Sequence, residues 1–189
     1  MVKVLSLDLS SHCGWAVLED DHILTYGKID IPCKDNSFPF GISAWAKSTA
    51  ETIFELIDAN PTDKVLIERS NSSKFRNSQN YLDFMHAYLI DILLDEGYSN
   101  KVIYIDSSHW RKVIGMKLND AQKKQNKLAK QANKNKTILR VDGKRVGKIT
   151  KKHLSVYYVN NKYNLSLKLK DNDIADCLSL ASSYFIENK

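Results

Sequence analysis

Cysteine is scarce in this chain of 189 residues, and its spacing excludes two kinds of small cross-linked protein. The three cysteines, Cys13, Cys33 and Cys177, are an odd number and form no C-x-x-C pair. Neither a disulfide framework nor a zinc knuckle is therefore indicated. The five histidines show no H-E-x-x-H or other paired metal spacing. A reducing, intracellular compartment is the expectation that fits this pattern.

Long hydrophobic runs and nucleotide-binding loops are also missing. No apolar run approaches the ~20 residues of a membrane span, and the N-terminal segment reaches Asp8 too early for a secretory signal. Gly143, Gly147 and Lys148 lack P-loop spacing, and no G-x-G-x-x-G occurs. Ser10-Ser11-His12 does not indicate a catalytic triad, because neighbouring side chains on an extended turn diverge. We expect no membrane association and no nucleotide cofactor.

The amounts of apolar and charged residues are those of an ordinary globular protein. Apolar residues make up 43% of the chain and charged residues 26%, far from disordered or collagen-like compositions. A chain of this length fits one domain with a sizeable core. We therefore expect a single domain over residues 1–189, which carries a basic insertion at about 116–148.

Basic charge is concentrated in one segment. Residues 111–152 hold 15 Lys and Arg against two acids, a net charge of +13, whereas the rest holds 13 basic and 20 acidic residues, a net charge of −7. An acidic body with one basic segment suits a protein that holds a polyanion while keeping carboxylates free for metal ions. The alternative is a solvated, lysine-rich surface insertion without a ligand.

Hydrophobic patterns predict an α/β fold. Three short strand-like segments, 2–9, 14–18 and 23–29, are separated by polar turns and predict antiparallel pairing. Two further strands, 64–68 and 102–105, each follow a helical stretch, so right-handed crossovers would set them parallel to the first. We predict a mixed five-stranded sheet, with strands 1–3 antiparallel, strands 4 and 5 parallel to strand 1, and helices on both faces.

Apolar residues at i, i+3 and i+4 predict the helices. A helix is also indicated around 120–132 and a hairpin turn at Asp142-Gly143, within a segment of weak periodicity. The remaining helices are expected at 42–57, 81–93, 107–115, from the N-cap Thr150 onwards, and at 172–187.

Four carboxylates fall where this fold would bring them together. Asp8 and Glu68 end the first and fourth strands, which are expected to be neighbours. Asp173 and Asp176 are three residues apart, so they project from one side of the last helix. Hydrolysis of a phosphodiester is assisted by two divalent cations held by carboxylate oxygens. Each acid alone could equally be an ordinary strand-end or helix-surface residue.

Three segments resemble the RuvC-type Holliday junction resolvases of the RNase H-like superfamily. The first is Leu5 to Ala16, where an Asp is followed by a Ser-containing turn and a Gly. The second is similar to the Glu-bearing fourth strand of that family, at Val65-Leu66-Ile67-Glu68. The third, Asp171 to Ala181, is the most specific and resembles the C-terminal helix that completes the site. The segment from 116 to 148 is longer and more basic than in bacterial members and resembles phage-encoded variants.

The resemblance implies an RNase H-like nuclease with two Mg²⁺ or Mn²⁺ ions per active site, held by Asp8, Glu68, Asp173 and Asp176. It implies metal-assisted attack of water on DNA, cleavage of Holliday junctions and related branched DNA, and a homodimer with the helix at 81–93 near its two-fold axis. Lys152 would contact the scissile backbone, or else is a plain surface lysine at a helix start. The expected location is the cytoplasm of a bacterial or phage-infected host cell.

The contacts to DNA are expected to come from the loop after Glu68, the β-turn after Asp8 and the basic segment. Phe75 between two cations could stack on an unpaired base, or could instead pack against the helix at 81–93. The full set of predicted DNA contacts is Ser10, Arg69, Lys74, Phe75, Arg76, Arg111, Lys112, Lys117, Lys123, Lys124, Lys127, Lys144, Arg145, Lys148 and Lys151.

Other functions remain open at this point. A nuclease of the same fold that cuts flaps, forks or RNA–DNA hybrids would need the same four acids. A non-catalytic protein that binds branched nucleic acid would need only the basic segment. An ATP-binding member of the wider ribonuclease H and actin-like group is disfavoured, because the glycine-rich phosphate loops are missing.

Overall fold

A mixed five-stranded sheet forms the centre of the molecule. In the computed structural model, which describes residues 1–69, 76–142 and 144–189, the strand order is β3-β2-β1-β4-β5. β1 pairs antiparallel with β2 and parallel with β4, while β2–β3 is antiparallel and β4–β5 parallel. This confirms the predicted sheet. The strands are β1 (Lys3–Asp8), β2 (His12–Glu19), β3 (His22–Asp30), β4 (Lys64–Arg69) and β5 (Val102–Asp106).

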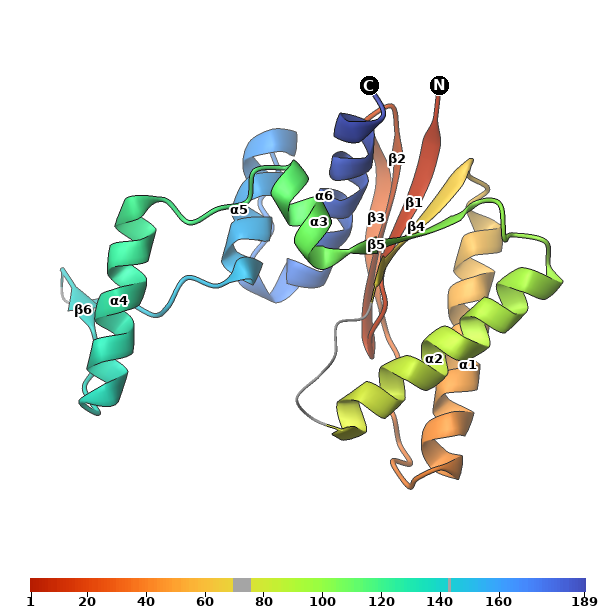
Figure 1. Cartoon of the computed structure of the whole chain (residues 1–189), viewed down its shortest axis with the longest axis horizontal. Coiled ribbons are helices and arrows are strands. Elements are labelled where there is room, and N and C mark those ends of the chain that lie inside the picture. The colour runs from red at the N-terminus through yellow and green to blue at the C-terminus, as the bar shows by residue number, and fades with distance from the viewer. Residues whose placement is uncertain (70–75, 143) are drawn as a thin grey trace.

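Helices cover both faces of this sheet, as predicted (Figure 1). One face carries α1 (Phe40–Ala59) and α2 (Arg76–Asp95). The other face carries α3 (Ser107–Val113), α5 (Lys151–Tyr163) and α6 (Asn172–Glu187), the last preceded by a 3₁₀ turn, η1 (Leu169–Asp171). Thr150 caps α5 as expected, through a capping box with His153.

The alternation of side chains along β1 decides which face the acids occupy. Leu5 and Leu7 are fully buried in the core under α1 and α2, whereas Val4 belongs to the core under α6. Ser6 also faces α6, because its hydroxyl donates to the carbonyl oxygen of Cys177 at 2.9 Å. Successive residues of a strand point to opposite faces, so Asp8 continues the Val4 and Ser6 series towards α6.

A small unit stands apart from the sheet and its helices, at the left of Figure 1. It consists of α4 (Asp120–Lys134) and the hairpin of β6 (Arg140–Val141) and β7 (Lys144–Arg145). We call residues 119–149 of this unit the basic arm. Both elements agree with the predicted helix and hairpin, although Gly143 lies outside the described residues.

The basic arm is held together by its own hydrogen bonds. Asn119 and Gln122 form a reciprocal capping box at the start of α4, with the Asn119 carboxamide accepting from the Gln122 amide at 2.8 Å. The Asn126 side chain pairs with both backbone groups of Ile149, at 2.7 and 2.9 Å. The returning chain is thereby fixed to α4 before it enters α5.

In the described part of the chain, no helix is long and apolar enough to cross a membrane.

Gly14 allows the start of α6 to approach β2 closely. A Cβ atom built on Gly14 would lie 2.3 Å from the carbonyl oxygen of Asp173. Real Cβ atoms do not come so near to backbone, so any larger residue would push the first turn of α6 away from the sheet. The position of Asp173 and Asp176 relative to the strands therefore depends on a glycine in β2.

We expect Gly14→Ala to destabilise the protein by about 1–3 kcal/mol, the usual cost of forcing atoms into a close-packed region. Thermal unfolding followed by circular dichroism would measure it. Gly147→Ala is the matched control, since a Cβ at Gly147 meets no atom within 4 Å. Equal melting temperatures for the two variants would contradict the argument.

Candidate active site

Four carboxylates from three elements gather at the end of β1, on the α6 face of the sheet. Asp8 and Glu68 come from β1 and β4, and Asp173 and Asp176 from the first turns of α6. Asp176 is 7% exposed. Burial raises the pKa of Asp8 well above its usual range, and the charges of Glu68, Asp176 and Asp173 raise it further. The structure thus brings the four predicted metal ligands into one electrostatic cluster.

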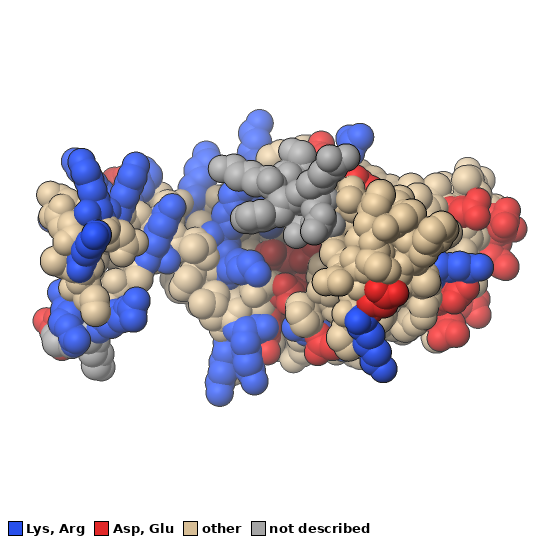
Figure 2. Space-filling model, turned by 90° about the horizontal axis from the view of Figure 1, so that it is seen from below, with Lys and Arg blue, Asp and Glu red and all other residues tan. Residues whose placement is uncertain are grey.

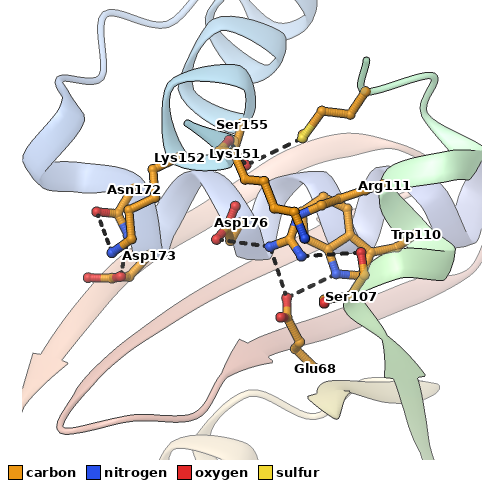
Figure 3. A network of polar contacts seen from close by, with 11 residues as sticks. Glu68, Ser107, Trp110, Arg111, Lys151, Lys152, Ser155, Asn172, Asp173 and Asp176 are labelled. Carbon is orange, nitrogen blue, oxygen red and sulfur yellow. Dashed lines mark hydrogen bonds and ion pairs between the residues drawn. The ribbon is translucent and has the colours of Figure 1, made fainter. Parts of the chain in front are cut away.

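A guanidinium lies inside this cluster (Figure 3). Arg111, from α3, is 3.5 Å from the Asp176 carboxylate and 3.8 Å from that of Glu68. It also donates to the carbonyl oxygen of Ser107 at 3.2 Å. The sequence predicts Arg111 as a DNA contact, but its side chain is only 13% exposed and faces the acids. The cluster therefore contains a counter-charge of its own.

Trp110 fixes both Arg111 and Glu68. Its side chain is fully buried, and its ring lies under the Arg111 guanidinium. The ring centroid is 4.2 Å from the guanidinium carbon, which is a favourable cation–π arrangement. The indole N–H donates to the Glu68 carboxylate at 2.9 Å. One short helix directly after β5 thus supplies both a hydrogen-bond donor and a cation to the neighbouring strand end.

The two acids next to Arg111 remain harder to ionise than usual. Burial raises the pKa of Glu68, and the nearby Arg111 guanidinium only partly opposes this. Burial likewise raises the pKa of Asp176, against the lowering effects of a hydrogen bond from Ser155 and the charge of Arg111. One arginine therefore does not balance the negative charge that the four acids would carry at neutral pH.

Asp173 has a separate set of partners at the edge of the cluster. The ammonium of Lys28, on β3, lies 3.4 Å from its carboxylate, and the Asn172 side-chain amide donates to it. Lys152 donates to the side-chain oxygen of Asn172 at 3.3 Å, so it reaches the acids through Asn172 (Figure 3). Lys152 also lowers the pKa of Asp176, as Lys151 does for that of Glu68.

The donor chemistry of the cluster fits divalent cations, although its present arrangement does not form a closed site. Carboxylate oxygens are the hard ligands that Mg²⁺ and Mn²⁺ prefer, and one oxygen of Asp176 is buried without a hydrogen-bond partner. Among the described residues, however, no group of three or more His, Cys, Asp or Glu side chains is placed so that it could hold an ion. Arg111 lies against both Glu68 and Asp176 in this arrangement.

The predicted DNA contacts divide into three groups. Lys74 and Phe75 lie outside the described residues, and the same holds for the side chains of Arg76 and Lys144. Arg69 ends β4 with its side chain 68% exposed, and Ser10 lies in the β1–β2 turn. The others, all exposed lysines and arginines, are Lys112, Lys117, Lys123, Lys124, Lys127, Arg145, Lys148 and Lys151.

Figure 2 shows how charge is distributed on the face that carries the cluster. Acidic side chains lie in a hollow near the centre, and basic side chains surround its left side and continue over the basic arm. A polyanion that crosses the hollow would meet positive charge beside the acids.

Sequence reasoning missed Lys28, Trp110 and the place of Arg111. Lys28 lies opposite Gly14 in the pairing of β2 with β3. A sequence-based prediction of this pairing would have placed Lys28 beside the segment that packs on Gly14. Trp110 and Arg111 lie on α3, the short helix that directly follows β5, and this was the available signal. Neither residue type has a spacing that distinguishes it from core or surface positions.

The strand order and pairing define an RNase H-like α/β fold, and solved structures of Holliday junction resolvases share this fold. Two solved structures of Thermus thermophilus RuvC have this fold. The complex with a Holliday junction substrate superimposes with a TM-score of 0.63 at 9% identity, over 100% of this chain and 95% of the other. The second structure gives 0.62 at 10% identity, over 98% and 95%.

The yeast mitochondrial Holliday junction resolvase Ydc2 is also similar, with a TM-score of 0.51 at 15% identity over 97% of this chain and 77% of the other. At identities this low, the structural similarity establishes a shared fold and nothing further. No protein-family model matches the sequence, and a search of curated proteins finds no match.

Asp8→Asn should stabilise the protein at neutral pH in the presence of EDTA. Folding raises the pKa of the Asp8 carboxyl. The protein therefore loses stability as pH rises from the pKa of this group in the unfolded chain, about 4, through its pKa in the folded protein. The amide carries no charge and avoids this loss. We expect the melting temperature at pH 7 to rise by about 3 °C or more, since 1 kcal/mol corresponds to about 2–4 °C in a chain of this length.

The difference between wild type and Asp8→Asn should shrink towards pH 4. Melting curves between pH 4 and pH 8, recorded by circular dichroism, test this directly. Asp95→Asn, at the exposed end of α2, is the control for removing one acid from the surface. A wild-type protein as stable as Asp8→Asn at pH 7 would show that the cluster carries no repulsive strain.

Proposed function

We propose that this protein is a Mg²⁺-dependent, structure-selective DNA endonuclease that cuts Holliday junctions and related branched DNA. The observation that carries the proposal is the cluster of Asp8, Glu68, Asp173 and Asp176 at the ends of β1 and β4 and the start of α6. The fold supports the same function, because structures similar to this one include a RuvC bound to a Holliday junction. The product of this reaction would be a nicked strand at each active site.

In the proposed mechanism the four acids hold two Mg²⁺ or Mn²⁺ ions. Bound there, the ions would activate water and stabilise the leaving oxygen. The role of the chain is to hold four carboxylates together despite their repulsion, which Trp110 and Arg111 do through Glu68 and Asp176. Lys151 and Lys152, at the start of α5, would contact the DNA backbone at the scissile phosphate.

A homodimer forms part of the proposal, since two strands of a four-way junction must be cut. α2 offers a surface for it. Ile90 and Leu94 are four residues apart and hence share one side of the helix, and they are 41% and 59% exposed. Apolar side chains in such a position are suited to contact a second copy.

The direct test is cleavage of a synthetic four-way junction in Mg²⁺. We expect Asp8→Asn, Glu68→Gln and Asp176→Asn each to lower the cleavage rate by about 10³-fold or more, because each removes a carboxylate that would bind the divalent cations. Flaps, forks, linear duplex and RNA–DNA hybrids in the same assay rank the substrates. Asp95→Asn serves as the control. A junction that is bound but never cut would favour the non-catalytic alternative.

The basic arm is proposed to hold a duplex arm of the substrate. Lys123 and Lys127 are exposed and four residues apart on α4, so they share one side of that helix. We expect the double Lys→Gln variant at these positions to bind all branched substrates more weakly. The slope of log K against log salt should become shallower by about 0.9 for each phosphate that the variant no longer neutralises.

A matched pair of substitutions separates this effect from total charge. Lys47 and Lys101 are exposed on α1 and just before β5, and their double Lys→Gln variant removes the same charge from the body. Fluorescence anisotropy at several salt concentrations measures both variants. Equal slopes for the two variants would remove the basic arm from the interface.

A further inference from the structure

A cavity of about 460 Å³ lies on the other side of the β1–β2 turn from the carboxylates. Its walls come from the turn itself, at Ser10 and His12, from Cys33 in the segment before α1, and from Trp45 on α1 and Tyr81 on α2. The mechanism proposed above uses none of these side chains, although Ser10 is among the predicted DNA contacts. The volume is within the range of ligand-binding cavities.

The aromatic walls of this cavity are held in fixed orientations. The Trp45 indole N–H donates to the Ile31 carbonyl oxygen at 2.9 Å. The rings of Trp45 and Tyr81 meet edge to face, with centroids 5.3 Å apart and an interplanar angle of 87°. Both rings are half-buried. Rigid aromatic faces that are partly open to a cavity can take up a flat π-system at little entropic cost.

A chain of charged contacts joins the cavity to the carboxylate cluster. The His12 ring lies 2.6 Å from Asp30, and the ammonium of Lys28 lies 3.4 Å from Asp30 and 3.4 Å from Asp173. Ser10 follows Asp8 by two residues. The turn that delivers Asp8 is therefore also one wall of the cavity.

We propose that this cavity receives an unpaired nucleobase of the strand whose phosphate lies at the carboxylates. This inference rests on the proposed function. Base–aromatic stacking accepts any base, because every base has a π-face, and unpaired bases are commonly recognised in this way. The imidazole of His12, which lines the cavity and is joined through Asp30 and Lys28 to Asp173, fits a nucleotide better than an apolar peptide.

Photo-crosslinking tests the proposal without relying on catalysis. Junctions carry 5-iodouracil at each position within three nucleotides of the cut, and the Asp8→Asn protein prevents cleavage. Irradiation followed by peptide mass spectrometry should place crosslinks on Trp45 or Tyr81. The Phe54–Tyr98 pair has nearly the same geometry, at 5.7 Å and 86°, but does not line the cavity, and should stay unlabelled.

Substitutions at Tyr81 supply the second measurement. Tyr81→Ala should lower the crosslink yield and the affinity for the junction about tenfold, the effect expected when one base is deprived of its aromatic partner, whereas Tyr81→Phe keeps the ring and should retain both. Melting temperatures verify that each variant is folded. A cavity filled by a second copy of the chain would instead give no DNA crosslink at Trp45 or Tyr81, and this result would overturn the proposal.

The two hypotheses fail in different ways. If junctions are bound and cut with Asp8-dependent rates but no crosslink maps to Trp45 or Tyr81, the base site is wrong and the nuclease stands. If no branched DNA is bound or cut, the proposed function itself is wrong. Unchanged affinity in Tyr81→Ala, with crosslinks on other residues, also overturns the base site.

Discussion

Mutual repulsion among buried carboxylates is the constraint on which the architecture of this protein depends. Acids at the ends of β1 and β4 and at the start of α6 can be packed together only if part of their charge is balanced or left protonated. Arg111 supplies the balancing charge for Glu68 and Asp176, and burial keeps Asp8 hard to ionise. The remaining negative potential would favour further cations, as the proposed function requires.

This constraint explains why positive charge is arranged in two tiers. The inner tier consists of Arg111 and Lys28, each in contact with an acid of the cluster. The outer tier lies on the basic arm, away from the sheet, where its lysines do not neutralise the acids (Figure 2). Phosphate attraction acts over a Debye length of about 8–10 Å. Separating the tiers therefore lets one chain attract a polyanion and still keep a negative site.

The fold was largely predictable because its signals are local. Alternation along β1 and the strand-like run 64–68 fix both strands, and right-handed crossovers then leave few sheet orders. The positions of Asp8 and Glu68 follow from this. The position of α6 does not, because the close approach to Gly14 depends on packing between residues about 160 positions apart. The contacts of Arg111 with the acids could not be predicted for the same reason, since its surroundings are set by α3 and α6 together.

The β1–β2 turn unites these features. Asp8 on its first side belongs to the face under α6, whereas His12 on its second side lines the cavity against α1 and α2. A strand of nucleic acid that crosses the end of the sheet would meet both faces within one turn, with phosphate on the acidic side and base on the aromatic side. A strand held at two such points has its direction defined relative to β1. Because a four-way junction contains strands of fixed polarity, a site that defines strand direction would select where the cut falls even without reading the sequence.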